Sequence, residues 1–271
     1  MTGAGQGAVA EVFDHAARQR RAALVGYLPA GYPSVAGAAE AMLTMVDAGA
    51  DLVEVGLPYS DPLMDGPVIQ RAVDAALHAG TTTADVLRTV ERLRNHGAVA
   101  LVMSYWNPVE RYGVERFARD LQAAGGAGVI TPDLIPDEGG PWLAAARARD
   151  LATVFLVAPS STDARLAATA AACRGFVYAA STMGVTGARA QVGSAARDLV
   201  ARTRAVTDLP VGVGLGVSTR DQAAEVASFA DGVIVGSALV RTLLDADGDE
   251  PAGRRALATL TASLAAGVRT R

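Results

Sequence analysis

Short runs of apolar, largely β-branched residues alternate along the whole chain with longer alanine-rich segments in which apolar positions recur every three or four residues. The short runs are typical of buried strands, and the longer segments have the period of helices that pack one face against a core. Nothing between them resembles an interdomain linker, so the pattern indicates repeated strand–helix units. Eight candidate strands begin near Ala22, Asp51, Val99, Gly128, Thr153, Gly175, Pro210 and Gly232.

The segments between these strands predict helices, several of which end at glycine, as helix C-termini commonly do. Because the strands are apolar almost throughout, we expect both faces of the sheet to be covered, as in parallel sheets flanked by helices. Eight such units predict a single-domain (β/α)8 barrel over residues 1–271, with its site on the loops after the strands. A doubly wound open sheet is the alternative, but no G-x-G-x-x-G motif follows the first strand. The clearest helix patterns cover residues 35–50, 84–97, 114–126, 163–173 and 219–230.

The spacing of the candidate strands singles out two of the eight units. The second and third strand starts lie 48 residues apart and the sixth and seventh lie 35 apart, whereas the other gaps are 22 to 29 residues. We therefore expect enlarged loops after strands two and six, on the face of the barrel that carries the chemistry. An additional helix is expected before the first strand. The glycine-rich start at residues 2–10 and the polar segment 245–255 are expected to be a frayed end and a surface loop.

Composition narrows the function classes. The chain is 51% hydrophobic and 19% charged, which excludes wholesale disorder, and no apolar run is long enough for a membrane span. All 24 basic residues are arginine, which excludes reactions that need a Schiff-base lysine. A net charge of −4 without basic runs argues against nucleic acid as a partner. The single Cys173 excludes an internal disulfide framework and a cysteine-built zinc site. Because no membrane span is present, we expect a cytoplasmic protein, and we expect no metal and no cofactor.

The second strand and the loop after it carry carboxylates. Glu54 lies within an apolar strand, where burial disfavours the ionised form and raises the pKa toward the range useful for proton transfer. On spacing alone, a glutamate bonded to an arginine or a backbone amide is an equally good interpretation. Asp61 and Asp65 follow in a proline-rich loop. Each taken singly is typical of a turn, but two carboxylates on one rigid loop are better catalytic candidates.

Glycines and an aromatic residue mark the later strands. Tyr178 lies in the sixth strand, and the Gly-Val-Thr-Gly segment after it suits a mobile lid or an anion contact. Taken alone, these residues are better explained as a core aromatic and turn glycines. The seventh and eighth strands end in VGVGLGVS and VIVGS, and the second of these loops leads into a helix at Ser237. Two such loops are typical of barrel phosphate sites, so they predict a phosphorylated substrate bound without lysine.

Taken together, these motifs resemble the α-chain family of tryptophan synthase, the indole-3-glycerol-phosphate lyases. The resemblance runs from about Phe13 to the C-terminus, and its most specific part is the pattern E-x-G-x-P-[FY]-S-D-P-x-x-D-G-P. It implies a (β/α)8 barrel that cleaves indole-3-glycerol phosphate to indole and glyceraldehyde 3-phosphate in tryptophan biosynthesis. The matching segments are LPAGYPS, LVEVGLPYSDPLMDGPVIQ, SYWNPVERYG, GVITPDLIPDE, FLVAPSST, FVYAASTMGVTG, PVGVGLGVS and ADGVIVGSALV.

The resemblance also implies roles for individual residues. Glu54 matches the family's acid–base glutamate, Asp65 its second catalytic aspartate and Tyr178 its active-site tyrosine. Tyr27 matches a position of the indole pocket that is phenylalanine in some members, and Leu215 matches another position often filled by phenylalanine. The positions that match the loop closing over substrate and the phosphate site are Thr186, Gly187, Leu215, Gly216, Gly236 and Ser237.

The implied reaction can be rationalised from these residues. Cleaving the bond between indole C3 and the glycerol side chain requires a proton at C3 while the ring N–H proton is drawn off. Glu54 is the candidate acid near C3 and, once ionised, the candidate base for the side-chain hydroxyl; Asp65 is the candidate carboxylate near the ring nitrogen. Each step should contribute roughly 10²- to 10⁴-fold. Tyr27 and Tyr178 would hold the ring, and phosphate capture would supply orientation.

A partner is implied by the resemblance alone. The family's α subunit passes indole to a pyridoxal-phosphate β subunit in an α2β2 complex, and this lysine-free chain cannot replace that β chain. A stand-alone lyase that releases free indole is one alternative. A non-catalytic subunit that activates a partner is another, although retention of both Glu54 and Asp65 argues against it. A related phosphate-binding barrel, such as a sugar-phosphate isomerase or the indole-glycerol-phosphate synthase, is a third, but the synthase chemistry relies on a lysine.

Overall fold

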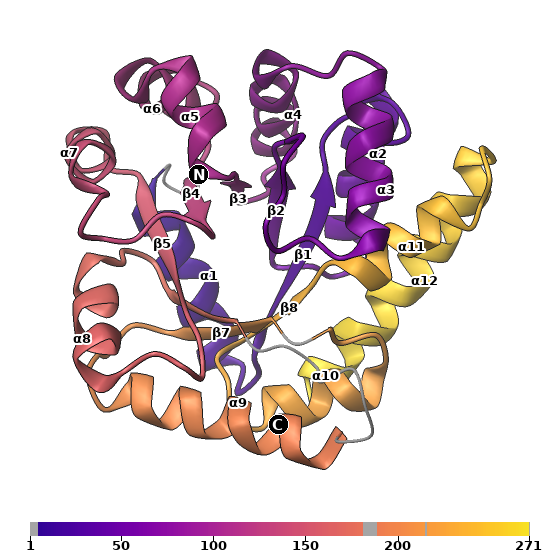
Figure 1. The fold of residues 1–271 in the computed structure, drawn as a ribbon. Coiled ribbons are helices and arrows are strands. Elements are labelled where there is room, and N and C mark those ends of the chain that lie inside the picture. Colours follow the sequence, from indigo (N-terminus) through magenta and orange to yellow (C-terminus); the bar gives the residue numbers. More distant parts are fainter. Residues whose placement is uncertain (1–4, 181–188, 215, 271) are drawn as a thin grey trace.

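The computed structural model describes residues 5–180, 189–214 and 216–270, which form a closed barrel of parallel strands surrounded by helices (Figure 1). Each strand pairs with its neighbours in sequence, and the last strand closes the barrel against the first. The predicted single-domain (β/α)8 barrel is therefore confirmed. The strands are β1 (Ala23–Pro29), β2 (Leu52–Gly56), β3 (Ala100–Met103), β4 (Gly128–Thr131), β5 (Ala152–Val157), β6 (Val177–Ala180), β7 (Val211–Gly214) and β8 (Gly232–Val235).

The helices lie mostly outside the barrel, between consecutive strands, where they pack against the sheet and against one another. One helix precedes β1, and pairs of helices follow β2, β3 and β8. The described helices are α1 (Gln6–Arg18), α2 (Val35–Asp47), α3 (Pro67–His78), α4 (Thr83–Asn95), α5 (Trp106–Tyr112), α6 (Val114–Ala123), α7 (Gly140–Ala148), α8 (Asp163–Ala172), α9 (Arg189–Arg204), α10 (Arg220–Ala227), α11 (Ser237–Leu244) and α12 (Glu250–Val268).

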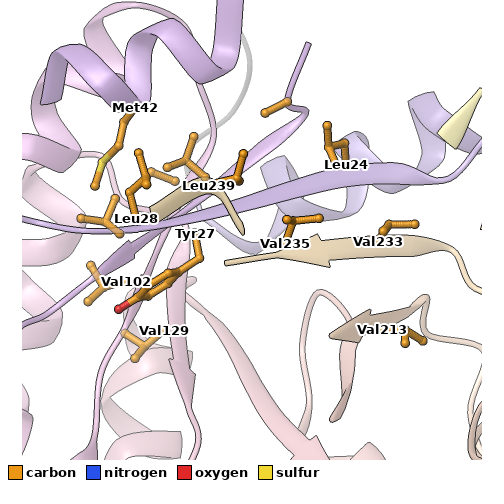
Figure 2. Close-up of a cluster of buried hydrophobic side chains, with 14 of the residues drawn as sticks. Leu24, Tyr27, Leu28, Met42, Val102, Val129, Val213, Val233, Val235 and Leu239 are labelled. Carbon is orange, nitrogen blue, oxygen red and sulfur yellow. The ribbon is translucent and has the colours of Figure 1, made fainter. Parts of the chain in front are cut away.

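Alternation along the strands sends apolar side chains either into the barrel or into the layer between the barrel and its helices. On β1, Val25 belongs to the cluster that fills the barrel interior, which we call the inner cluster, whereas Leu24 and Leu28 face the helices. Figure 2 shows Leu28 near Met42 of α2, while Tyr27 leaves the opposite side of the strand. Inward-facing residues near the carboxyl ends of the strands therefore face the barrel mouth.

Helix α1 closes the amino-terminal end of the barrel. Its buried Val9, Phe13 and Ala16 belong to the inner cluster, and the Phe13 ring centroid lies 5.1 Å from that of Phe176, just before β6. Gly232 at the start of β8 makes room for this helix, because a Cβ there would lie 2.9 Å from the Phe13 ring. In the described structure that end is covered, so the opposite end, at the carboxyl ends of the strands, is the expected entrance for a substrate.

Two expectations about irregular segments are corrected by the structure. Residues 2–10 are expected from composition to fray, but α1 begins at Gln6 because Val9 is buried against the barrel interior. Segment 245–255 is a loop only as far as Asp249. The Asp249 side chain accepts a hydrogen bond from the Ala252 N–H (2.9 Å) and so caps α12.

The long segment after β2 has the position that the strand spacing predicts. Residues 57–66 form a loop, which we call the β2 loop, and both α3 and α4 follow before β3. Residues 181–188, where the loop after β6 falls, lie outside the described residues, and α9 begins immediately after them. Within the described ranges, no helix is long and apolar enough to cross a membrane.

A buried ion pair fixes the starts of the first two strands. Arg21 is 5% exposed, and its guanidinium donates two hydrogen bonds to the Asp51 carboxylate, at 2.6 and 2.7 Å. Asp51 also accepts a hydrogen bond from the Leu24 N–H (2.8 Å). Paired bonds between a guanidinium and a carboxylate have a defined geometry. This cluster therefore helps to fix the register between β1 and β2, in which Val25 lies beside Leu52.

Substitution of Asp51 tests that role. Asp51→Ala leaves the buried Arg21 guanidinium without its partner, and we expect the free energy of unfolding to fall by about 3 kcal/mol. The matched control is Glu40→Ala, which removes an exposed ion pair with Arg92 and should change stability by at most about 1 kcal/mol. Urea denaturation of both variants provides the measurement, and equal effects would contradict a special role for the buried pair.

Candidate active site

The register of β1 and β2 places two polar side chains next to each other in the barrel mouth. Tyr27 pairs with Glu54 across the two strands, and both occupy inward-facing positions. Gly56 lies two residues beyond Glu54 on the same face of β2. A Cβ at Gly56 would lie 2.5 Å from the Tyr27 hydroxyl oxygen, so glycine is required where the Tyr27 ring crosses the strand.

Glu54 is buried without a compensating partner. Its side chain is 1% exposed, and Oε1 makes no hydrogen bond to any described residue. Burial disfavours the ionised carboxylate and raises the pKa of Glu54 to about 8. The alternative interpretation from sequence, a structural glutamate bonded to an arginine or a backbone amide, is not what the described residues show. At neutral pH this carboxyl group holds a proton that it can donate.

Asp65 approaches the same mouth from the β2 loop. The Tyr105 hydroxyl donates a hydrogen bond to Asp65 Oδ1 (3.2 Å) and accepts one from the Met64 N–H (2.9 Å). Burial raises the pKa of Asp65, and the hydrogen bond from Tyr105 opposes that rise. Tyr105 itself is buried, which is the main reason that its pKa is raised to about 12. The hydroxyl therefore stays protonated and available to Asp65.

Two tyrosine rings flank the carboxyl groups. Tyr178 lies on β6, and a Cβ at Gly214 of β7 would lie 2.5 Å from its hydroxyl oxygen. Burial raises the pKa of Tyr27 and of Tyr178 well above the usual value. The nearby charge of Glu54 adds to both shifts, and that of Asp65 adds to the shift of Tyr27. These couplings show that the groups share one site, whose phenols remain neutral.

The ends of β7 and β8 offer glycines and a helix start, and β8 lies next to β1 in the barrel. Gly236 precedes α11, and no side chain caps the first turn of that helix, so its leading N–H groups are available to an anion. A Cβ at Gly236 would lie 3.4 Å from the Tyr27 ring, which links this helix start to the carboxyl side of the mouth. Gly216 has φ of 65°, a conformation that favours glycine. Gly216 follows the end of β7 and Ser237 is the first residue of α11, so both come after the carboxyl end of a strand.

The remaining site residues expected from the sequence fall into two groups, one exposed residue and three residues that the structure does not describe. Asp61 is exposed and accepts a hydrogen bond from the Ser60 hydroxyl (2.6 Å), so it belongs to a turn and does not join Asp65 in the mouth. Of the two aspartates of the loop, the structure therefore favours Asp65 as the catalytic candidate. Thr186, Gly187 and Leu215 fall outside the described residues.

Sequence reasoning missed three residues that shape the site. Tyr105 lies two residues after the end of β3, a position comparable to that of the β2 loop after β2, and this placement was the available signal. Gly56 and Gly214 were indistinguishable from ordinary strand-end glycines, because their role is to leave space for Tyr27 and Tyr178 from neighbouring strands. Their function depends on register, which only the folded barrel specifies.

The arrangement suits acid–base chemistry on a planar, largely apolar molecule that carries an anionic group. One carboxyl group is buried and protonated, a second is held by a phenol, and aromatic rings and a helix start surround them. In the described part of the chain, no group of three or more His, Cys, Asp or Glu side chains could hold a metal ion.

Comparison with known proteins agrees with this geometry. The sequence model of the family "Tryptophan synthase alpha chain" matches residues 13–269. The tryptophan synthase alpha chain of Salinispora tropica is 63% identical over 258 residues, which cover 95% of this chain and 96% of that protein. The corresponding chain of Mycobacterium marinum is 61% identical over 260 residues, covering 96% of this chain and 94% of that protein.

Solved structures give the same result. A chain of Mycobacterium tuberculosis tryptophan synthase superposes with a TM-score of 0.90 at 57% identity, over 98% of this chain and 99% of that chain. The alpha subunit of Legionella pneumophila tryptophan synthase superposes with a TM-score of 0.87 at 30% identity, over 96% of this chain and 97% of that chain. With a matching family model and relatives of this identity over nearly its whole length, the chain belongs to the tryptophan synthase alpha chain family.

Proposed function

We propose that Glu54 and Asp65 divide the proton transfers of the lyase reaction between them. As a member of its family, the chain is a carbon–carbon lyase of tryptophan biosynthesis that cleaves indole-3-glycerol phosphate to indole and glyceraldehyde 3-phosphate. The observation that carries the residue assignment is the buried, partnerless carboxyl group of Glu54 in the same mouth as the hydrogen-bonded Asp65. Different surroundings give the two groups different protonation states at one pH.

Glu54 acts first as an acid and then as a base. Its carboxyl group, protonated below about pH 8, delivers a proton to C3 of the indole ring, and C3 becomes tetrahedral. The resulting carboxylate takes the proton of the hydroxyl on the adjacent glycerol carbon. The electrons of that O–H bond form the aldehyde carbonyl as the C–C bond breaks. The electron pair of the broken C–C bond returns to the ring and restores its aromaticity. Glu54 ends the cycle protonated, so the proton count balances.

Asp65 acts at the ring nitrogen. Its carboxylate accepts the N–H proton as C3 is protonated and returns it when the aromatic indole forms again. The hydroxyl of Tyr105 stabilises the ionised form of Asp65, because a donated hydrogen bond lowers the pKa of the acceptor. Tyr27 and Tyr178 contact the ring and exclude water from it, which supports proton transfer to carbon.

The phosphate of the substrate binds at the carboxyl ends of β7 and β8. The uncapped N-terminus of α11 and the glycine backbone at Gly216 and Gly236 supply N–H groups, and Ser237 supplies a hydroxyl. By resemblance to the family, Thr186, Gly187 and Leu215 complete the site. Anchoring the phosphate there fixes the position of the reacting bond relative to Glu54, so remote binding energy contributes to catalysis.

A β chain of tryptophan synthase is the proposed partner, in an α2β2 complex in which the β chain uses indole. Leu63 and Met64 on the β2 loop are 77% and 54% exposed, unusual values for apolar side chains of this size. They lie beside Asp65 at the mouth from which indole would leave. A contact at this loop would let a partner receive indole directly and would also influence the position of Asp65.

Amide substitutions test the assignment of the two carboxyl groups. Glu54→Gln and Asp65→Asn preserve size but remove the proton transfers, so we expect each to slow indole release by roughly 10²- to 10⁴-fold. Asp61→Asn, on the same loop but outside the site, is the matched control and should release indole at the rate of the unsubstituted protein. Steady-state assays of the purified chain supply the rates. Wild-type turnover by Glu54→Gln would refute the acid–base role of Glu54.

The pH dependence of kcat/KM provides a second test. Asp65 must be ionised, so kcat/KM should rise as the pH increases through the raised pKa of Asp65. Glu54 must be protonated, so kcat/KM should fall again as the pH increases through about 8. A bell-shaped profile is expected. An alkaline limb that persists unchanged in the residual activity of Glu54→Gln would show that another group causes it.

Association with a β chain can be measured separately. We expect the purified chain to co-elute with a tryptophan synthase β chain from a size-exclusion column and to release indole faster when that chain is added. Release of indole without any association would favour the stand-alone lyase. Activation of the β chain without cleavage of indole-3-glycerol phosphate would favour a non-catalytic activating subunit.

A further inference from the structure

The β2 loop is held by the segment that follows β3. In the part of the chain that the structure describes, each hydrogen bond from residues 57–66 to another strand–helix unit ends on residues 103–105. The Leu57 N–H donates to the Met103 carbonyl (2.9 Å), and Tyr105 binds both Met64 and Asp65. The position of Asp65 therefore depends on the end of β3.

Tyr105 makes three contacts with the β2 loop. Its hydroxyl accepts from the Met64 N–H at 2.9 Å and donates to Asp65 Oδ1 at 3.2 Å. Its ring centroid lies 5.5 Å from that of Tyr59, with the two planes inclined by 36°. Because the hydroxyl uses its proton for Asp65 and a lone pair for Met64, a small displacement of Tyr105 disrupts both hydrogen bonds.

The backbone on both sides of Tyr105 is fixed by polar contacts. The buried Ser104 hydroxyl donates to the Tyr105 carbonyl (2.7 Å), and the Ser104 N–H donates to the Ile130 carbonyl of β4 (3.1 Å). Tyr105 is also the N-cap residue of α5, yet its side chain does not cap that helix. The first turn of α5 must therefore obtain its acceptor from elsewhere.

That acceptor is Asp133, in the loop after β4. Both of its carboxylate oxygens lie within hydrogen-bonding distance of the Trp106 N–H, at 2.9 and 3.1 Å. A carboxylate at the start of a helix satisfies a free N–H group and interacts favourably with the helix dipole. Asp133 thus fixes the peptide unit that follows Tyr105, although it makes no hydrogen bond to Asp65 in the described structure.

We propose that Asp133 is a positioning residue for catalysis, which by capping α5 holds Tyr105 where its hydroxyl orients Asp65 and the β2 loop. The inference rests on the proposed role of Asp65. It connects three consecutive units of the barrel. Asp133, after β4, fixes the position of Tyr105, after β3, and Tyr105 fixes the position of Asp65, after β2. Asp133 itself touches neither substrate nor the proton that is transferred.

Kinetics of three variants test the proposal. Tyr105→Phe removes the donor to Asp65, so we expect kcat to fall roughly tenfold. The acid limb of the kcat/KM profile should move to higher pH, because the hydrogen bond that lowers the pKa of Asp65 is lost. Asp133→Ala should shift that limb in the same direction. Asp133→Asn keeps an oxygen acceptor for the Trp106 N–H and should behave like the unsubstituted protein.

A matched control distinguishes an effect on the position of Tyr105 from the general effect of losing a helix cap. Thr162 caps α8 through its hydroxyl, which accepts from the Arg165 N–H (3.3 Å), and the loop that holds it is remote in sequence from the β2 loop. Thr162→Ala should lower thermal stability, as Asp133→Ala does, but leave the acid limb where it is. An Asp133→Ala profile with an unmoved acid limb, or an equal shift in Asp133→Asn, would overturn the proposal.

Hydrogen exchange gives a readout that does not require activity. The Met64 amide, bonded to the Tyr105 hydroxyl, should exchange faster in Tyr105→Phe and in Asp133→Ala, and at the unsubstituted rate in Asp133→Asn and Thr162→Ala. In the double variant Tyr105→Phe/Asp133→Ala, the Met64 amide should exchange only slightly faster than in Tyr105→Phe alone. Full additivity, or unchanged Met64 exchange in Asp133→Ala, would refute the connection. If exchange responds as expected but Asp65→Asn stays fully active, the proposed function fails and the structural connection stands.

Discussion

The exclusion of water from one carboxyl group is the constraint on which the site depends. Glu54 lies on a strand whose neighbours in the barrel wall are largely apolar, and the described structure gives its Oε1 no hydrogen-bond partner. The same apolar interior that stabilises the barrel therefore keeps this group protonated at neutral pH. A more polar surrounding would stabilise the carboxylate and remove the acid, so here stability of the fold and reactivity of the site have one physical origin.

The two carboxyl groups are supported in different ways. Glu54 is part of a strand that is paired on both sides, so its position follows from the barrel itself. Asp65 lies on a loop and owes its position to side chains contributed by the next unit, chiefly Tyr105. The proposed acid is thus held by a strand paired on both sides, while the carboxylate next to the exposed part of the loop is held by a few hydrogen bonds that a partner could adjust.

The sequence predicts the scaffold well because strands in a parallel barrel are buried on both faces and appear as continuous apolar runs. Glu54 stands out for the same reason, as a charge within such a run. Position just after β3 was the only signal for Tyr105, and the roles of Tyr105 and Asp133 could not be predicted, because they arise from contacts between residues that lie far apart in the chain. The helical start at Gln6 was missed because burial of Val9 by the barrel interior outweighs the flexibility that the neighbouring glycines suggest. The start of α12 was predictable: Asp249 precedes Glu250 and a proline, a common helix-start pattern.

Helix α1 covers the end of the barrel that lies opposite the mouth, and its outer surface is exposed at Asp14 and Ala17. The chain offers amine-reactive reagents no lysine side chain, and its single thiol, at Cys173, is buried. A lysine or cysteine introduced on the outer face of α1 would therefore be a unique side-chain handle. Immobilised through that handle, every molecule on a solid support would present its open end to the solution.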